Sequence, residues 1–159
     1  MSEIMTYPIS DAVTLKSFTD PRFKTMRVSV NMLLPLNKST AARNAILPSL
    51  VVRATREYPD YTALGRRLSY LYGASLGSGV QKIGEYQALG LSAGGIASRY
   101  AFGGEDMFAE LSDLLLGVLF DPLRDENGLF PEDGFTQEKR QQLEQKDAEF
   151  SDKMIYAHQ

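Results

Sequence analysis

The chain offers few side chains that could hold a transition metal. Its 159 residues contain a single histidine, His158, and no cysteine. A catalytic zinc site uses three protein ligands, and a lone histidine cannot supply the pair of imidazoles that one helix often contributes. We expect His158 to face solvent at a helix end. Carboxylates alone can bind magnesium or calcium, but the acidic stretch 121–134, DPLRDENGLFPEDG, lacks EF-hand spacing and is interpreted as a solvated connection. The sequence therefore predicts no metal and no cofactor.

The sequence also shows no pattern of an activated serine nucleophile or of a phosphate-binding loop. The chain has several serines, but no histidine is placed in the sequence to activate one, and no G-x-S-x-G motif occurs. The glycine-rich stretch 73–79, GASLGSG, lacks the G-K-[ST] ending of a phosphate loop and follows a predicted helix instead of opening one. Its glycines are interpreted as turns, bulges or points of close backbone approach. No catalytic group of residues emerges from these patterns.

Composition restricts the classes of partner. The 17 basic and 20 acidic residues give a net charge of −3, which argues against a nucleic-acid partner. The most apolar run, 111–120, is much shorter than the roughly 20 residues of a membrane span, and no signal peptide is evident at the N-terminus. The absence of cysteine fits a reducing compartment. We expect a soluble, cytoplasmic protein that binds neither nucleic acid nor membrane.

Two strand pairs are predicted from the alternation of apolar and polar residues. The first joins 13–18 to 25–36 as an antiparallel hairpin, with a turn at Asp20 and Pro21. The second lies within 74–95 and turns at Ile83-Gly84-Glu85.

Helical periodicity predicts helices within 37–58, 60–73, 104–122 and 136–159. In the first of these, Pro48 interrupts the apolar stretch 45–55, AILPSLVVRAT. A proline fits there only in the first helical turn or at a kink. Caps are available to the first helix at Ser39, Thr40 or Asn44 and to the second at Asp60 or Thr62.

The order ββ-α-α-ββ-α-α predicts an α+β fold with an antiparallel or mixed sheet and helices packed on one face. Residues 1–159 are interpreted as a single domain. The apolar stripe of the last helix runs through Leu143, Phe150, Met154 and Ala157 without a capping residue. We therefore expect the chain to be the N-terminal part of a first domain, with one or more domains beyond it.

The segment from Val51 to Tyr86 carries a more specific pattern. Four pieces follow one another there: Ala54-Thr55, Tyr58-Pro59, the helix from Leu64 to Leu71, and Gly73-Ala74. In these pieces, and in the element order of nearly the whole chain, the sequence resembles the insulinase/pitrilysin family of zinc metallopeptidases, the inverzincins. It is most similar to the shorter bacterial two-domain members that lack the zinc motif. The resemblance implies a metallopeptidase-like ββαα-ββαα domain.

The resemblance also implies where the zinc motif would stand. Counting back from Thr55, the first histidine of H-x-x-E-H falls on Ala45, the glutamate on Pro48 and the second histidine on Ser49. In active members the two imidazoles hold zinc and the glutamate activates its water. Alanine has no donor atom, proline has no side-chain base, and a serine hydroxyl is a poor zinc ligand. A kinked core segment without any link to the family is the alternative interpretation.

The third ligand of the family is a glutamate in a later helix. Glu138-Lys139 matches the start of its E-R pattern, which puts Gln145 at the ligand position. The resemblance therefore implies a degenerate site at all four positions and no bound metal.

Three functions follow from the resemblance. The leading hypothesis is a catalytically inactive homologue, acting as a non-catalytic subunit or peptide-binding scaffold with a zinc-motif-bearing peptidase-like partner or as a homo-oligomer. The alternatives are an active zinc-dependent endopeptidase with its site outside this chain and a stand-alone peptide-binding module. Family members bind extended peptide by adding it to a sheet edge. The predicted edge consists of Leu76, Gly77, Ser78, Gly79 and Val80, unless this segment is only a structural strand.

Overall fold

A computed structural model of the chain describes residues 4–151, with side chains described as far as Ala148. The strands are β1 (Ile4–Ser10), β2 (Val13–Phe18), β3 (Thr25–Pro35), β4 (Ser75–Ile83) and β5 (Tyr86–Ile96). The helices are α1 (Ala41–Val51), α2 (Tyr61–Tyr70), α3 (Met107–Phe120) and α4 (Glu132–Ser151), with a short 3-10 turn at Ser98–Tyr100. His158 and the end of the apolar stripe expected on the last helix (Phe150, Met154 and Ala157) lie outside the described side chains.

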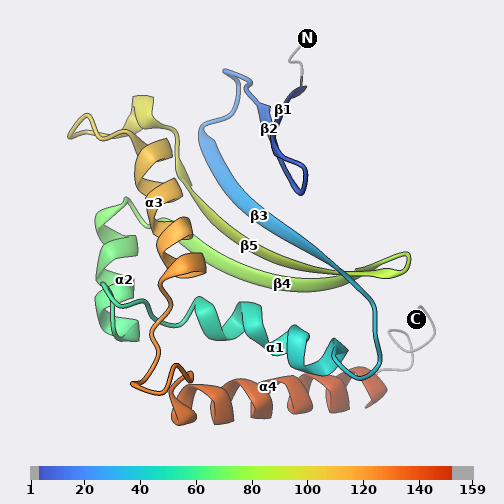
Figure 1. Ribbon diagram of the computed structural model, residues 1–159. Helices are drawn as coiled ribbons and strands as arrows, with labels where there is room; N and C mark the ends of the chain where they lie inside the picture. Colours follow the sequence, from blue (N-terminus) through green and yellow to red (C-terminus); the bar gives the residue numbers. More distant parts are fainter. Residues whose placement is uncertain (1–3, 152–159) are drawn as a thin grey trace.

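A three-stranded antiparallel sheet in the order β3-β5-β4 forms the centre of the fold. Helix α3 packs across β3 and β5, and α1 packs across β5 and β4. The helices lie on one side of this sheet, with α4 against the outer side of α1 (Figure 1). The expected α+β architecture with an antiparallel sheet and helices on one face is confirmed.

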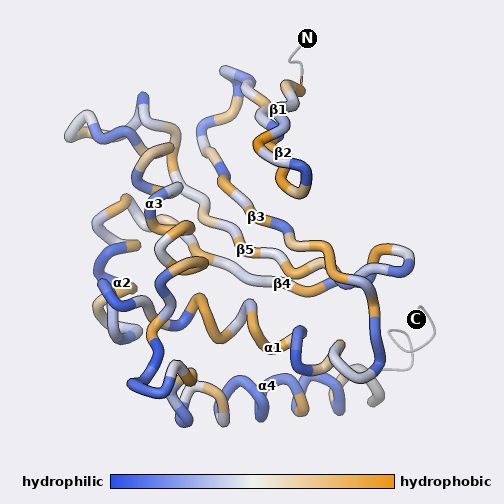
Figure 2. The backbone as a smooth tube through the Cα atoms, viewed as in Figure 1, coloured by the Kyte–Doolittle hydropathy of each residue, from blue (hydrophilic) through white to orange (hydrophobic). Residues whose placement is uncertain are grey.

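Strand register gives the sheet two different faces. Val28 pairs with Ala93 and Val30 with Leu91, and these side chains face the helices. Side chains alternate along a strand, so the alternate positions face the other side, where most residues are small or polar and Leu33 is an exposed exception. The most deeply buried large side chains are Leu71, Leu91, Met107, Leu111, Leu115 and Val118. Figure 2 shows that α1 is largely apolar, whereas α4 is mostly hydrophilic. The core therefore lies between the sheet and α3, with contributions from α2.

The predicted hairpin between 13–18 and 25–36 is wrong. Both strands exist, but β2 pairs with β1, and β3 pairs with β5. The pairing with β5 places the half-buried residues of β3 beside buried residues of β5 on the side of the sheet that faces the helices. No strand was predicted at residues 4–10, where the structure has β1. The structure accommodates Pro8 in a two-stranded hairpin, where the register shifts between Pro8 and Ser10.

The first helix contains Pro48 in its interior, at its eighth residue and beyond its first turn. Proline cannot donate the backbone hydrogen bond to the carbonyl four residues earlier. Thr40 occupies the cap position of α1 but makes no side-chain cap bond, whereas Asp60 caps α2 by accepting a hydrogen bond from the Ala63 amide. Helix α4 begins at Glu132, four residues before the predicted start. Among the residues that the structure describes, no helix is long and apolar enough to cross a membrane.

The position of the core yields a stability prediction for α3. Leu111 is fully buried, whereas Leu116 on the same helix is 45% exposed. We expect Leu111→Ala to lower the free energy of unfolding by about 2–5 kcal/mol, because it leaves a cavity. The matched change Leu116→Ala should cost no more than about 0.5 kcal/mol. Urea denaturation followed by circular dichroism measures both, and equal losses would contradict the assigned core.

Candidate functional site

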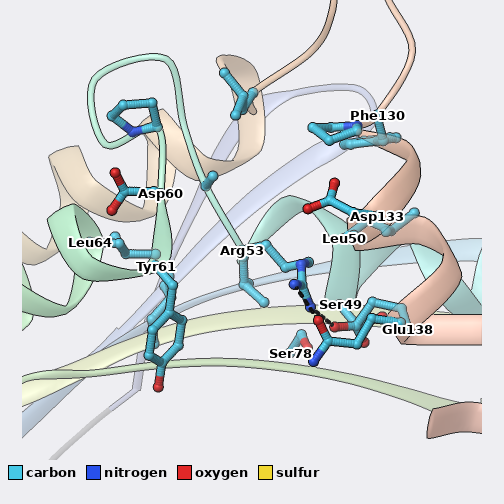
Figure 3. A pocket seen from close by; sticks show the side chains of 18 of the residues that line it. Ser49, Leu50, Arg53, Asp60, Tyr61, Leu64, Ser78, Phe130, Asp133 and Glu138 are labelled. Carbon is cyan, nitrogen blue, oxygen red and sulfur yellow. Dashed lines mark hydrogen bonds and ion pairs between the residues drawn. The ribbon is translucent and has the colours of Figure 1, made fainter. Parts of the chain in front are cut away.

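A cavity of about 950 Å³ lies between α1, α2, α4 and strand β4. Its walls are mainly apolar and include Leu50, Leu64, Leu68, Leu76 and Phe130. The segment after α1, residues 52–54, and the loop before α4 complete the lining. Figure 3 shows Arg53 in the middle of this space, with Asp60 and Tyr61 on one side and Asp133 and Phe130 on the other. The site is thus a mainly apolar cavity with Arg53 at its centre and the carboxylates of Asp60 and Asp133 on its two sides.

The Arg53 side chain bridges α1 and α4 across the cavity. Its guanidinium donates to Glu138 Oε1 at 2.6 Å and to Gln137 Oε1 at 2.9 Å. The side chains of Arg53 and Glu138 are 33% and 12% exposed, so the ion pair is largely shielded from water. Glycine at position 134 makes room for it, because a Cβ atom there would lie 3.2 Å from the Arg53 Nε atom. The pair therefore depends on a close approach of the two segments.

A compact turn after α1 positions the cavity wall. The Thr55 amide donates to the Tyr58 carbonyl, and the Thr55 hydroxyl accepts from the Tyr58 amide, each at 2.9 Å. Thr55 is buried and also forms a β-bridge with Pro122. The bridge to Pro122 connects the turn to the loop that follows α3. Farther along, this loop contains Phe130, which lines the cavity. The pieces Ala54-Thr55 and Tyr58-Pro59 therefore have a structural role here.

The three positions of the expected zinc motif all lie on α1, but only one reaches the cavity. Ser49 lines it, and its hydroxyl donates to the Ile46 carbonyl at 2.9 Å within the same helix. Pro48 is buried, and Ala45 is half-buried. None of these side chains offers an imidazole or a carboxylate. Within residues 4–151, no group of three or more histidine, aspartate or glutamate side chains is arranged to hold a metal ion.

The position expected for the third ligand lies on the exposed side of α4. Gln145 is exposed and is not part of the cavity lining. The residue of α4 that contacts Ala45 is Gln142, one turn earlier, whose Nε2 donates to the Ala45 carbonyl at 3.2 Å. Helix α4 therefore lies next to the expected motif helix, but the residue that contacts this helix is Gln142 and not Gln145.

Strand β4, which contains the predicted peptide-binding edge, is an edge strand. Its only partner in the described part of the chain is β5. Leu76 and Ser78 line the cavity, whereas Gly77 and Gly79 border a shallow depression on the opposite face of the sheet, and Val80 is 40% exposed. Backbone groups on the free side of an edge strand can pair with another extended chain. The predicted segment thus combines an unpaired edge with access to a cavity.

Sequence reasoning missed the polar residues that shape the site. Arg53, Gln137 and Gln142 were not singled out, and Glu138 was considered only as the start of a family pattern. The ion pair joins residues 85 positions apart in the sequence, and no local pattern signals such a contact. Asp133 belongs to the stretch 121–134, which was interpreted as a solvated connection, whereas the structure places it in the first turn of α4.

The bridge between the helices can be tested by substitution. Arg53→Met keeps much of the aliphatic stem but removes the guanidinium, so Glu138 is left half-buried without its partner. We expect a loss of about 1–3 kcal/mol in unfolding free energy and faster hydrogen exchange in α4. The control is Arg56→Met, because Arg56 pairs with Asp121 at 3.3 Å while 81% exposed and should contribute less than about 1 kcal/mol. Unchanged exchange in α4 of Arg53→Met would contradict the proposed role of the bridge.

Comparison with known proteins finds similar proteins, including the following two. The chain is 28% identical over 137 residues to a protein of Bacillus subtilis (strain 168) named "Probable inactive metalloprotease YmfF", a match that covers 86% of this chain and 32% of that protein. It is also similar to the crystal structure of a conserved protein from Enterococcus faecalis V583, with a TM-score of 0.88 and 29% identity over 98% of this chain and 36% of that one. No protein-family model matches the chain. The chain spans about a third of the length of both relatives, and over most of its own length it is similar to a metalloprotease-like protein that is itself named inactive.

Proposed function

We propose that this chain belongs to a non-catalytic homologue of the insulinase/pitrilysin-type zinc peptidases. In this proposal it binds extended peptide at β4 and serves as a non-catalytic subunit for an active peptidase that carries the zinc motif. The observation that carries the proposal is the chemistry of α1. Ala45, Pro48 and Ser49 stand where the family has its two imidazoles and its carboxylate, and the Ser49 hydroxyl is already bonded to a carbonyl of its own helix.

A zinc peptidase needs three protein ligands and a base that takes a proton from the metal-bound water. The donors that α1 and α4 do present near this position are the Arg53 guanidinium and the Gln142 amide, which point at oxygen atoms of the opposite helix. The Arg53 guanidinium cannot ligate a metal ion, and the Glu138 carboxylate is bonded to it. One carboxylate and an amide oxygen fall short of the three ligands of a catalytic zinc site. The name of the Bacillus subtilis relative agrees with this interpretation.

Peptide binding is supported by the geometry of β4. An added antiparallel strand would form main-chain hydrogen bonds with the free edge and place alternate side chains toward the cavity. The glycines at 77 and 79 leave the opposite side of this strand unobstructed. A protein that retains the edge and the cavity but lacks the metal ligands can hold a peptide without cleaving it.

The partner in this proposal is a related subunit with an intact zinc motif. A homo-oligomer is the alternative. Affinity purification of the full-length protein from its own cell extract, followed by mass spectrometry, distinguishes the two. Recovery of a zinc-motif-bearing relative supports the subunit role, whereas recovery of this protein alone contradicts it.

Catalytic inactivity is tested by metal content and cleavage together. The full-length protein, equilibrated with excess zinc and desalted, should retain far less than one zinc ion per chain by elemental analysis. It should leave casein and insulin B chain intact at every concentration tested. Stoichiometric zinc together with cleavage that a chelator abolishes would establish the alternative, an active endopeptidase.

The β4 edge is tested with N-methylated peptides. Successive amides of an added strand point alternately toward β4 and away from it. Methylation of one alternate set should therefore reduce affinity at least about tenfold by fluorescence anisotropy, while methylation of the other set should change it little. Equal effects of the two sets would exclude strand addition as the mode of binding.

A further inference from the structure

The lining of the cavity beside β4 indicates which side chain of a bound peptide would fit there. This inference rests on the proposed peptide binding. We propose that it accepts a long side chain with a positive charge at its end, a lysine or an arginine. The apolar walls would surround the aliphatic stem, and Asp60 and Asp133 would face the cation.

The depth and lining of the cavity favour a long stem. Leu64 and Leu50 are 4% and 5% exposed, so the cavity floor is formed by well-packed apolar side chains. A volume of about 950 Å³ leaves room for a long side chain. Lysine and arginine bury their aliphatic stems against apolar surface while the charged ends stay near water. Such side chains match a cavity that is apolar inside and charged at its margin.

The charge of the lining decides between a cationic and a neutral occupant. The charged residues of the lining are Arg53, Glu138, Asp60 and Asp133. Arg53 and Glu138 neutralise each other in their ion pair. Neither Asp60 nor Asp133 forms an ion pair in the described part of the chain. The lining therefore has an excess of two carboxylates, which favours a cationic ligand and disfavours an anionic one.

The two carboxylates come from different elements and lie on different walls (Figure 3). Asp60 precedes α2 and uses its Oδ1 atom to accept the Ala63 amide at 2.7 Å. Asp133 lies in the first turn of α4 and is exposed. Arg140, which lines the adjoining depression with Asp133, pairs instead with Glu144 at 3.6 Å. No basic residue of the described lining other than Arg53 competes for the position between the two walls.

Strand addition at β4 would deliver a side chain to this place. Leu76 and Ser78 belong to the edge strand and also line the cavity. Side chains of an added strand that face the helices would lie next to these two residues, because neighbouring strands are about 4.8 Å apart. One residue of the peptide would then point between the walls that carry Asp60 and Asp133.

The test uses the full-length protein and labelled heptapeptides that differ only at the central residue, which is lysine, norleucine or glutamate. Norleucine keeps the apolar stem and lacks the charge. In low salt we expect the lysine peptide to bind about fivefold more tightly than the norleucine peptide and the glutamate peptide to bind most weakly. High salt should reduce the preference for lysine, because exposed charges are screened.

Variants assign the preference to the two carboxylates. The double change Asp60→Asn and Asp133→Asn should make the lysine and norleucine peptides bind equally. Asparagine caps a helix as well as aspartate does, and urea denaturation confirms that the variant is folded. Asp113→Asn removes an exposed carboxylate of α3 that lies outside the cavity, so it should leave the preference unchanged.

The outcomes separate this inference from the proposed function. If all three peptides bind wild-type protein equally, or if the preference for lysine survives in the double variant, the inference is overturned while peptide binding stands. Tighter binding of the norleucine peptide overturns it as well. If no peptide binds and sedimentation shows a dimer, a second copy of the chain covers β4, and the proposed peptide binding fails together with the inference.

Discussion

The hydrogen bonds of Arg53 hold α4 against α1, and the cavity depends on this arrangement. Most of α4 is hydrophilic (Figure 2), so burial of apolar surface contributes little to its packing against the rest of the domain. Its described polar contacts are the bond from Gln142 to the Ala45 carbonyl of α1 and those of Gln137 and Glu138 with Arg53, in the segment directly after α1. A half-buried guanidinium that is bonded to two acceptors is stabilising only when the geometry is good. The glycine at 134 provides that geometry.

Under the proposed relationship, this polar bridge lies where an active family member would have its metal site. In a zinc peptidase of the inverzincin type, the metal ion would itself join the two helices, because its ligands come from both. Under the proposed relationship, groups other than a metal ion join the two segments here. Arg53, Glu138 and Gln142 do so with ordinary hydrogen bonds, and the cavity wall next to β4 is kept although the metal ligands are absent.

The sequence allowed much of the fold to be predicted, because strands and helices of this chain have strong local patterns. The β4–β5 hairpin and α2, with a cap at Asp60 or Thr62, were predicted from alternation, a glycine turn and capping residues, and Asp60 forms the cap. Pairing between distant strands was not predictable in the same way. Nothing near Thr25 indicates that β3 pairs with β5, some sixty residues later, and β1 was not predicted. For the site, the sequence itself shows that the segment forming α1 has no histidine, aspartate or glutamate. The Arg53 bridge could not be inferred from the sequence, because it depends on how two helices approach each other.

The hairpin of β1 and β2 has a consequence for the behaviour of the whole chain. Nearly all of its side chains are exposed, among them Ile4, Ile9, Val13, Leu15 and Phe18. Arg99 anchors the connection to β3 by donating to the carbonyls of Pro21 and Phe23. A two-stranded ribbon with so little burial is only marginally stable by itself, so it can unfold while the sheet and its helices remain intact. Proteolytic nicking in this ribbon would therefore leave a resistant remainder that begins near the anchor, and thermal melting of the chain would not be a single cooperative transition.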